Sequence, residues 1–222
     1  MIIQYLPDAN SYIELLITAL VTLLAAYLGA RFAFDMQRKK QEKDEHNSNI
    51  VSANLTLFEL IRCHNLFLNM KEQLIGAFET HPDRHHFIKP MINTPLPVPV
   101  INFSHLAFLL DKDPNLLASL AILQTDLQGT IEVIRHRSEI YVEKLQPLVE
   151  QFERSRPGES TIDLAEIEGA FGRKNTAHLV QSTEFMVTGI NRAIESTKNL
   201  SAQFRKKVKE VYPKAKIIGL EE

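Results

Sequence analysis

Three histidines lie close together in the sequence, at His81, His85 and His86. Imidazole nitrogens are common zinc ligands, but a zinc site needs a third or fourth ligand that is held in fixed geometry. These histidines stand in a proline-rich segment, where a loop is expected. We therefore expect solvated loop histidines, and the sequence predicts neither a metal ion nor another cofactor. The three residues are its candidate metal ligands.

Motifs for catalysis are absent from the sequence. It contains no Gly-rich phosphate-binding loop, no G-x-S-x-G elbow and no H-E-x-x-H pattern. Cys63 and His64 are adjacent, so on a helix their side chains point about 100° apart and cannot form a nucleophile–base pair. We expect Cys63 to be a small core residue and His64 to carry a hydrogen-bonded ring. An enzymatic activity is therefore not favoured.

A further histidine follows an arginine in the segment Arg173-Lys-Asn-Thr-Ala-His178. This segment resembles the R-x4-6-H motif of HEPN-type ribonucleases, which are all-α proteins. The resemblance implies that Arg173 and His178 act jointly on RNA phosphates, in general across a dimer. The arginine would stabilise the charge of the phosphorane, and the histidine would move the 2′-OH proton. The match covers six residues, and Lys174 stands where the family favours a smaller polar residue.

The C-terminal part of the chain is strongly basic. Six cationic residues lie between positions 205 and 216: Arg205, Lys206, Lys207, Lys209, Lys214 and Lys216. Cations at the end of a helix complement its dipole, which predicts a solvated helix end. The alternative is a patch for an acidic partner, RNA or anionic lipid headgroups. Nucleic acid is not favoured, because the formal net charge of the chain is −2.

The elements that carry these residues follow from the distribution of apolar residues. As a helix, residues 12–34 would be roughly 34 Å long, enough to cross a hydrocarbon core of about 30 Å. The charged residues Glu14 and Arg31 lie within a turn of its ends. A buried core helix and a signal peptide share this composition, but residues 1–14 lack the Lys or Arg of a signal peptide. We expect a retained membrane-spanning helix.

Basic residues predict the orientation of this helix. None precedes it, and five stand at its C-terminal end or soon after: Arg31, Arg38, Lys39, Lys40 and Lys43. Because Lys and Arg stay on the cytoplasmic side, we expect residues 1–11 outside and the residues after 34 in the cytoplasm. The predicted location is the cytoplasmic (inner) membrane, and a single unpaired cysteine agrees with a reducing compartment.

Small residues form two rows along the same helix. One row repeats every four positions, and a second lies beside it: Ala25, Gly29 and Ala33, then Thr22, Ala26 and Ala30. Such rows let two membrane helices approach closely, so they predict a homo-oligomer. The alternative is that Ala, Gly and Thr are simply frequent in membrane helices.

The rest of the chain is expected to be all-α. No Gly or Pro occurs between positions 35 and 78 except Gly76, so the helix can continue through a charged stalk at 35–49 and on toward residue 79. Apolar stripes then predict an elongated bundle or coiled coil of about three long helices over 50–212. A proline-rich connector at 80–103 would lie extended along it, and 213–222 would form a tail. Strand patterns are absent from the sequence.

Composition and layout limit the function without naming it. A single Cys, 8 Gly and 10 Pro in 222 residues exclude a disulfide-rich or collagen-like protein. We expect a membrane-anchored protein that self-associates in the lipid bilayer and docks a protein partner, senses a signal, or acts as an effector at the membrane. The alternatives are a membrane-tethered HEPN-like ribonuclease and a membrane-disrupting effector of a defence or toxin system.

Overall fold

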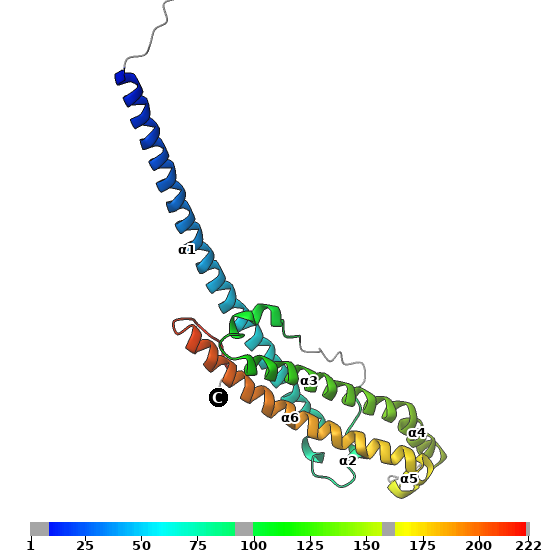
Figure 1. Ribbon diagram of the computed structural model, residues 1–222. Coiled ribbons are helices and arrows are strands. Elements are labelled where there is room, and N and C mark those ends of the chain that lie inside the picture. The colour runs from blue at the N-terminus through cyan, green and yellow to red at the C-terminus, as the bar shows by residue number, and fades with distance from the viewer. Residues whose placement is uncertain (1–8, 92–99, 157–162, 221–222) are drawn as a thin grey trace, which may run out of the picture. The chain divides into compact units, whose positions relative to one another are not determined.

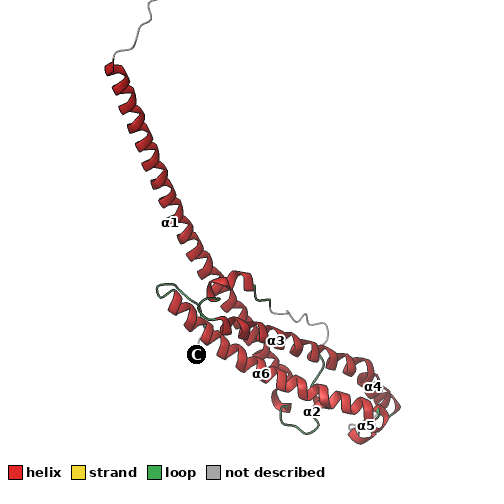
Figure 2. Ribbon diagram, viewed as in Figure 1, coloured by secondary structure: helices red, strands yellow, loops and turns green. Residues whose placement is uncertain are grey.

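A computed structural model describes residues 9–91, 100–156 and 163–220, with side chains from residue 13 onward. Within these ranges all regular structure is helical and no strand occurs (Figure 2), which confirms the prediction of an all-α protein. The chain divides into two compact units, Met1–Asn49 and Ile50–Glu222. Helix α1 (Ala9–Met70) begins in the first unit and ends in the second.

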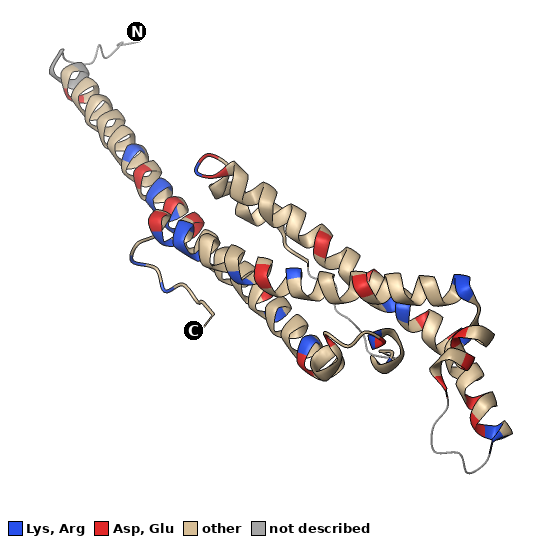
Figure 3. Cartoon of the chain, turned by 90° about the horizontal axis from the view of Figure 1, so that it is seen from below, with Lys and Arg blue, Asp and Glu red and all other residues tan. Residues whose placement is uncertain are grey.

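The first unit is the apolar and charged part of α1. Between Ile13 and Phe34 its large apolar side chains are each 55–71% exposed. The helix is long and apolar enough to cross a membrane, with a mean hydropathy of 2.0 and no part of the apolar window buried. Figure 3 shows that charged residues become frequent along α1 after this apolar stretch. The predicted apolar N-terminal helix is therefore present, and it is not a core helix of this fold.

The predicted continuation of this helix toward residue 79 is present, because the chain stays helical to Phe78, but the type of helix changes in the last turns. Regular α-helix ends at Met70, and a π-helical turn (Lys71–Ile75) and a 3₁₀ turn (Gly76–Phe78) follow. Gly76 has a φ of 25°, a conformation that side-chain-bearing residues rarely adopt. The π-helical turn and the 3₁₀ turn therefore form the transition from α1 to the connector.

Three long helices share the core of the second unit: α1, α3 (Pro114–Ile140) and α6 (Arg173–Val211). Helices α3 and α6 pack along each other (Figure 1). Most residues of the predicted apolar stripes are buried here, among them Leu57, Leu60, Phe67, Leu120, Leu127, Ile131, Ile190, Phe204 and Val208. Phe78, in the 3₁₀ turn that follows α1, is 36% exposed.

Helix α3 begins with residue types that favour a helix N-terminus. The side chain of Asp113 accepts a hydrogen bond from the backbone N–H of Leu116 at 3.1 Å, and Pro114 occupies the first turn. At its other end a π-helical turn (Tyr141–Leu145) leads into α4 (Gln146–Ser155). Pro147 lies in the first turn of α4, where a missing N–H costs no helical hydrogen bond.

A smaller second core closes the end of this unit. Helix α5 (Leu164–Phe171) contributes Ile167 and Phe171, which pack with Leu145 and Leu179. Gly172, with a φ of 84°, makes the turn from α5 into α6. This turn sets α5 against the start of α6, and α5 also packs against α4.

The described part of the connector before residue 92 contains a short helix, α2 (Arg84–Phe87), which the sequence did not predict. A single turn fits between Pro82 and Pro90 because neither proline has to lie inside it. The described ends of the connector bond to side chains of α3: the N–H of Met91 donates to Ser138 Oγ, and that of Ile101 to Gln124 Oε1. The predicted extended stretch at 92–99 lies outside the described residues.

Candidate metal centre

Helix α2 is held in place by a buried arginine of α3. The side chain of Arg137 is fully buried, and its Nη2 donates to the backbone carbonyls of His85 and Ile88. Its Nε donates to Thr183 Oγ1 of α6 at 3.0 Å. One planar guanidinium thus joins α2 to both α3 and α6, because its donors point in fixed directions.

The charge of Arg137 has no carboxylate partner among the described residues. Burial lowers the pKa of its guanidinium to about 10, and the nearby Tyr141 opposes this shift. The ring of Tyr141 lies 5.7 Å from the guanidinium carbon, within cation–π range. Nη1 has no hydrogen-bond partner in the described part of the chain. With a pKa near 10 the side chain is still a cation at neutral pH.

A second arginine, Arg84 of α2 itself, also fixes the position of this helix. The guanidinium of Arg84 forms an ion pair with Glu184 of α6, with Nε 3.0 Å from Oε1, and it also donates to the carbonyl of Glu79. Because Arg84 precedes His85 directly, these bonds fix the position of the turn that carries the histidine pair. Two arginines therefore hold a helix that is only four residues long.

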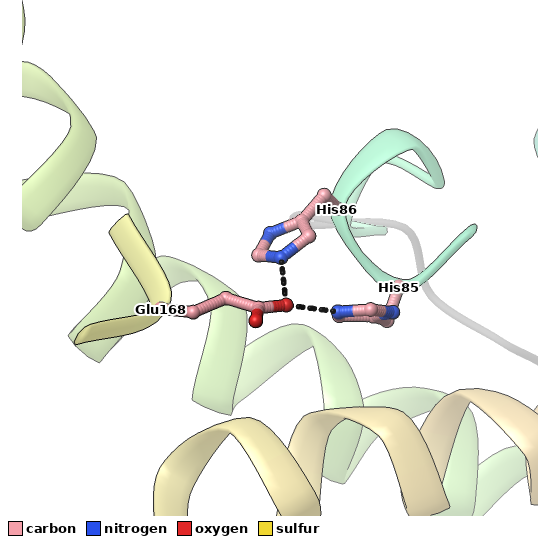
Figure 4. A group of neighbouring side chains, drawn as sticks. All are labelled: His85, His86 and Glu168. Atoms are coloured by element: carbon pink, nitrogen blue, oxygen red, sulfur yellow. Dashed lines mark hydrogen bonds and ion pairs between the residues drawn. The ribbon is translucent and has the colours of Figure 1, made fainter. Parts of the chain in front are cut away.

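The two histidines of α2 converge on one carboxylate of α5 (Figure 4). His85 Nε2 lies 3.3 Å from Glu168 Oε1, and His86 Nε2 lies 3.1 Å from the same oxygen. The ring centroids are 4.2 Å apart. The side chains of His85 and His86 are 8% and 6% exposed, whereas that of Glu168 is 40% exposed. The cluster is thus a half-enclosed site with its carboxylate toward solvent.

The surroundings favour a neutral His85 and an ionised Glu168. Burial, and then the charge of His86, lower the pKa of His85. The hydrogen bond from His86, followed by that from His85, lowers the pKa of the Glu168 carboxyl against the opposing effect of burial. A neutral imidazole carries a free lone pair on one ring nitrogen. The site therefore offers two nitrogen donors and one carboxylate.

Helix α5 presents Glu168 to this site. Asp163 caps its N-terminus by accepting from the N–H of Ala165 at 3.0 Å. At its C-terminus the N–H of Gly172 donates to the carbonyl of Glu168 itself. The backbone of Glu168 thus lies in the last turn of a helix that is capped at both ends, and His85, His86 and Glu168 come within 4.8 Å of one another through their ligand atoms.

The structure changes the interpretation of the histidine cluster. The expectation of solvated loop histidines is wrong for His85, which is 6% exposed as a whole residue. His81 is not part of the site: its Nδ1 accepts from the N–H of Asp83, and its ring packs edge-on against Phe87. Glu168 was missed because it stands 83 positions from His85, and no sequence spacing links the two.

Cys63 and His64 lie where the sequence predicts. Cys63 is 3% exposed in the core, and burial raises the pKa of its thiol to about 11. A thiol with such a pKa is a poor nucleophile at neutral pH. His64 Nδ1 lies 3.2 Å from both the carbonyl of Ile194 and Thr197 Oγ1. Cys63 is therefore a core residue, and His64 links α1 to α6.

The proposed ribonuclease pair does not converge within one chain. Arg173 and His178 are both exposed in the first turns of α6. Five positions on a helix separate two side chains by about 140° around the axis, so they point to different sides. A site shared between two chains stays a prediction.

The basic C-terminal residues surround a segment that packs onto the core. Ile217 is buried, and Asn54 of α1 donates to the carbonyl of Lys216 and accepts from the N–H of Ile218. Lys207 lies 3.3 Å from Glu210 and 4.0 Å from Asp113. The other five cations are exposed, and a role for them in binding an acidic partner stays a prediction.

Comparison with known proteins gives no relative from which a function could be transferred. No protein-family model, curated protein or solved structure matches this chain.

Proposed function

We propose that this chain is a single-pass membrane protein whose second unit is a cytosolic helical bundle. The observation that carries the proposal is the exposure of the apolar part of α1, where side chains such as Leu15 and Phe34 are each 71% exposed. Leaving about a dozen such side chains in water would cost on the order of 20 kcal/mol relative to burying them. A lipid bilayer removes this cost, because it surrounds the apolar side chains with hydrocarbon. The helix can enter it, because the backbone polar groups within a helix are already hydrogen-bonded to one another.

The charges around the apolar part of α1 support an orientation with the second unit in the cytoplasm. Basic residues follow the span and none precedes it, and Lys and Arg remain on the cytoplasmic side. The membrane would then be the cytoplasmic (inner) membrane. The second unit contains a free buried Cys63, which suits a reducing compartment.

The two rows of small residues support self-association. Ala25, Gly29 and Ala33 recur every four positions and have small side chains, which would let a second helix approach closely on that side. The hydroxyls of Thr18 and Thr22 donate to the carbonyls of Glu14 and Thr18, at 2.8 and 2.7 Å. Because these hydroxyls are bonded within the helix, the packing would depend on close van der Waals contact. An oligomer held in this way would dock a partner or relay a signal at the membrane.

Disulfide cross-linking in native membranes tests this proposal. In a Cys63→Ala background, Gly29→Cys should form a disulfide dimer on mild oxidation, because Gly29 lies in the small-residue row. Leu24→Cys is the matched control, since Leu24 lies about 140° around the helix from Gly29. Equal cross-linking of the two variants, or none of either, would contradict association through this face.

Extraction of the membranes tests the anchor separately. The chain should stay in the membrane pellet after alkaline carbonate treatment and be released by detergent. Release by carbonate alone would contradict the span, whatever the cross-linking shows.

A further inference from the structure

We propose that His85, His86 and Glu168 bind one divalent transition-metal ion, for which Zn²⁺ is the best match. The site lies wholly within the second unit, so the inference does not depend on the membrane anchor. It rests on the arrangement of the three side chains and on the way the fold holds them.

The distances fit a metal ion. Zinc binds imidazole nitrogen and carboxylate oxygen at about 2.0–2.2 Å, so two ligands of a tetrahedral zinc ion lie about 3.4 Å apart. The Nε2 atoms of His85 and His86 lie 3.3 and 3.1 Å from Glu168 Oε1. Two edges of the tetrahedron are thus present before any ion enters. In the metal-free site, the protons on Nε2 of His85 and His86 point toward Glu168 Oε1. Metal binding through Nε2 requires each ring to carry its proton on Nδ1 instead.

The ligands are held before metal binding. Two arginines fix the short helix that carries both histidines: Arg137 of α3 donates to the backbone of α2 and to Thr183 of α6, and Arg84 of α2 donates to Glu184 of α6. Glu168 lies in the last turn of α5, where the N–H of Gly172 bonds its carbonyl. A site whose ligands are already ordered loses little conformational entropy on binding. This ordering distinguishes the cluster from exposed acidic or histidine-rich loops.

The donor set selects the class of ion. Two imidazoles and one carboxylate suit Zn²⁺ and its transition-metal neighbours, whereas Ca²⁺ and Mg²⁺ prefer six or more oxygen ligands. Two histidines and one glutamate, with water as the fourth ligand, form a known type of zinc site. The side chain of Glu168 is 40% exposed, so solvent can reach the fourth position. An ion here would link the connector to α5.

Metal binding should stabilise the fold measurably. A ligand at 100 times its dissociation constant, bound only by the folded state, raises the unfolding temperature of a unit of this size by about 5–10 °C. The measurement uses the full chain in detergent micelles, stripped with a chelator and then titrated with zinc sulfate against a chromophoric chelator. We expect one zinc ion per chain and a zinc-dependent rise in unfolding temperature.

Variants locate the ion. His86→Ala and Glu168→Gln should each weaken zinc binding at least tenfold and abolish most of the thermal shift. Glu168→Gln keeps the size and one acceptor of the side chain, so loss of binding in this variant is not loss of folding. His81→Ala is the matched control from the same connector, and it should bind zinc as the unmodified chain does. Replacing zinc with Co²⁺ gives a second readout, the visible absorption of a four-coordinate cobalt site.

Three outcomes would overturn the proposal. They are the absence of a zinc-dependent thermal shift in the unmodified chain, unchanged binding in both His86→Ala and Glu168→Gln, and a loss of binding in His81→Ala equal to theirs. In the first two cases the three side chains form a hydrogen-bonded cluster and no metal site. The outcome is independent of membrane extraction, so failure here leaves the proposed anchor in place.

Discussion

At the scale of single residues, Arg137 is the least expected feature of the core. It is the largest fully buried side chain in the described part of the chain, and it has no carboxylate partner there. Moving a cation out of water costs several kcal/mol, which is why burial lowers its pKa to about 10. Its hydrogen bonds to carbonyls of His85 and Ile88 offset part of this cost. A lysine could not make these bonds and reach Thr183 with the same geometry.

Cys63 gives a prediction about pH at the same scale. Burial raises the pKa of its thiol to about 11 in the fold, against an ordinary value of 9.0. Below pH 9 the thiol is protonated whether the chain is folded or not, so it causes no pH dependence. Between pH 9 and 11 the unfolded chain loses this proton and the folded chain keeps it. The free energy of unfolding should then fall by up to about 1.4 kcal/mol per pH unit.

The measurement is urea unfolding of the unmodified chain and of Cys63→Ala at several pH values. Because other groups titrate in this range, the relevant quantity is the difference between the two free energies of unfolding. Near pH 8 the unmodified chain should be more stable by about 1 kcal/mol, owing to the lost side-chain volume in Cys63→Ala. Toward pH 11 the difference should change by about 2–3 kcal/mol, so that Cys63→Ala becomes the more stable chain, and a difference that stays constant would contradict the prediction.

At the scale of elements, the turn between α5 and α6 depends on Gly172. Its φ of 84° with a ψ of 140° is a conformation open almost only to glycine. Gly172→Ala should therefore destabilise the second unit by about 1–3 kcal/mol, although no atom lies within 4 Å of the added Cβ. Thermal unfolding followed by circular dichroism measures this effect.

Gly169 is the matched control for this prediction. A Cβ added at this position would also meet open space, but Gly169 lies inside α5 and its φ is not positive. Alanine is the better helix former by about 1 kcal/mol, so Gly169→Ala should keep or raise stability. If both variants destabilise the protein equally, crowding near α5 and not backbone conformation is the cause.

The elements also show what the sequence could predict. The apolar stripes of α1, α3 and α6 follow from local spacing, and most of their residues are buried. The turns after Met70 and the short helix α2 did not follow, because tertiary contacts decide where a helix stops. The site itself joins α2 to Glu168 across 83 positions. This contact depends on the direction that the chain takes at the Gly172 turn between α5 and α6. The spacing of apolar residues in the sequence does not predict that direction.

At the scale of the whole molecule, the two units differ in what they bury. The apolar part of the first unit is exposed throughout, whereas the second unit contains both apolar clusters. Every buried residue of these clusters lies at position 53 or later. The second unit therefore has the core that an independent domain needs, and its folding should not depend on the membrane.

Truncation tests this independence of the second unit. A chain that begins at Asp44 keeps one turn of α1 ahead of Ile50, and we expect it to be soluble without detergent. It should be helical by circular dichroism, and its unfolding should be cooperative, with a midpoint temperature within a few degrees of that of the second unit in the full chain.

The full chain with Leu20→Arg and Leu24→Arg is the control, because two charges should cost about 5–7 kcal/mol at the centre of a membrane helix. That variant should insert into the membrane less well than the unmodified chain, while its second unit remains folded. A truncated chain that aggregates or unfolds without cooperativity would show that the apolar helix is needed for folding as well as for anchoring.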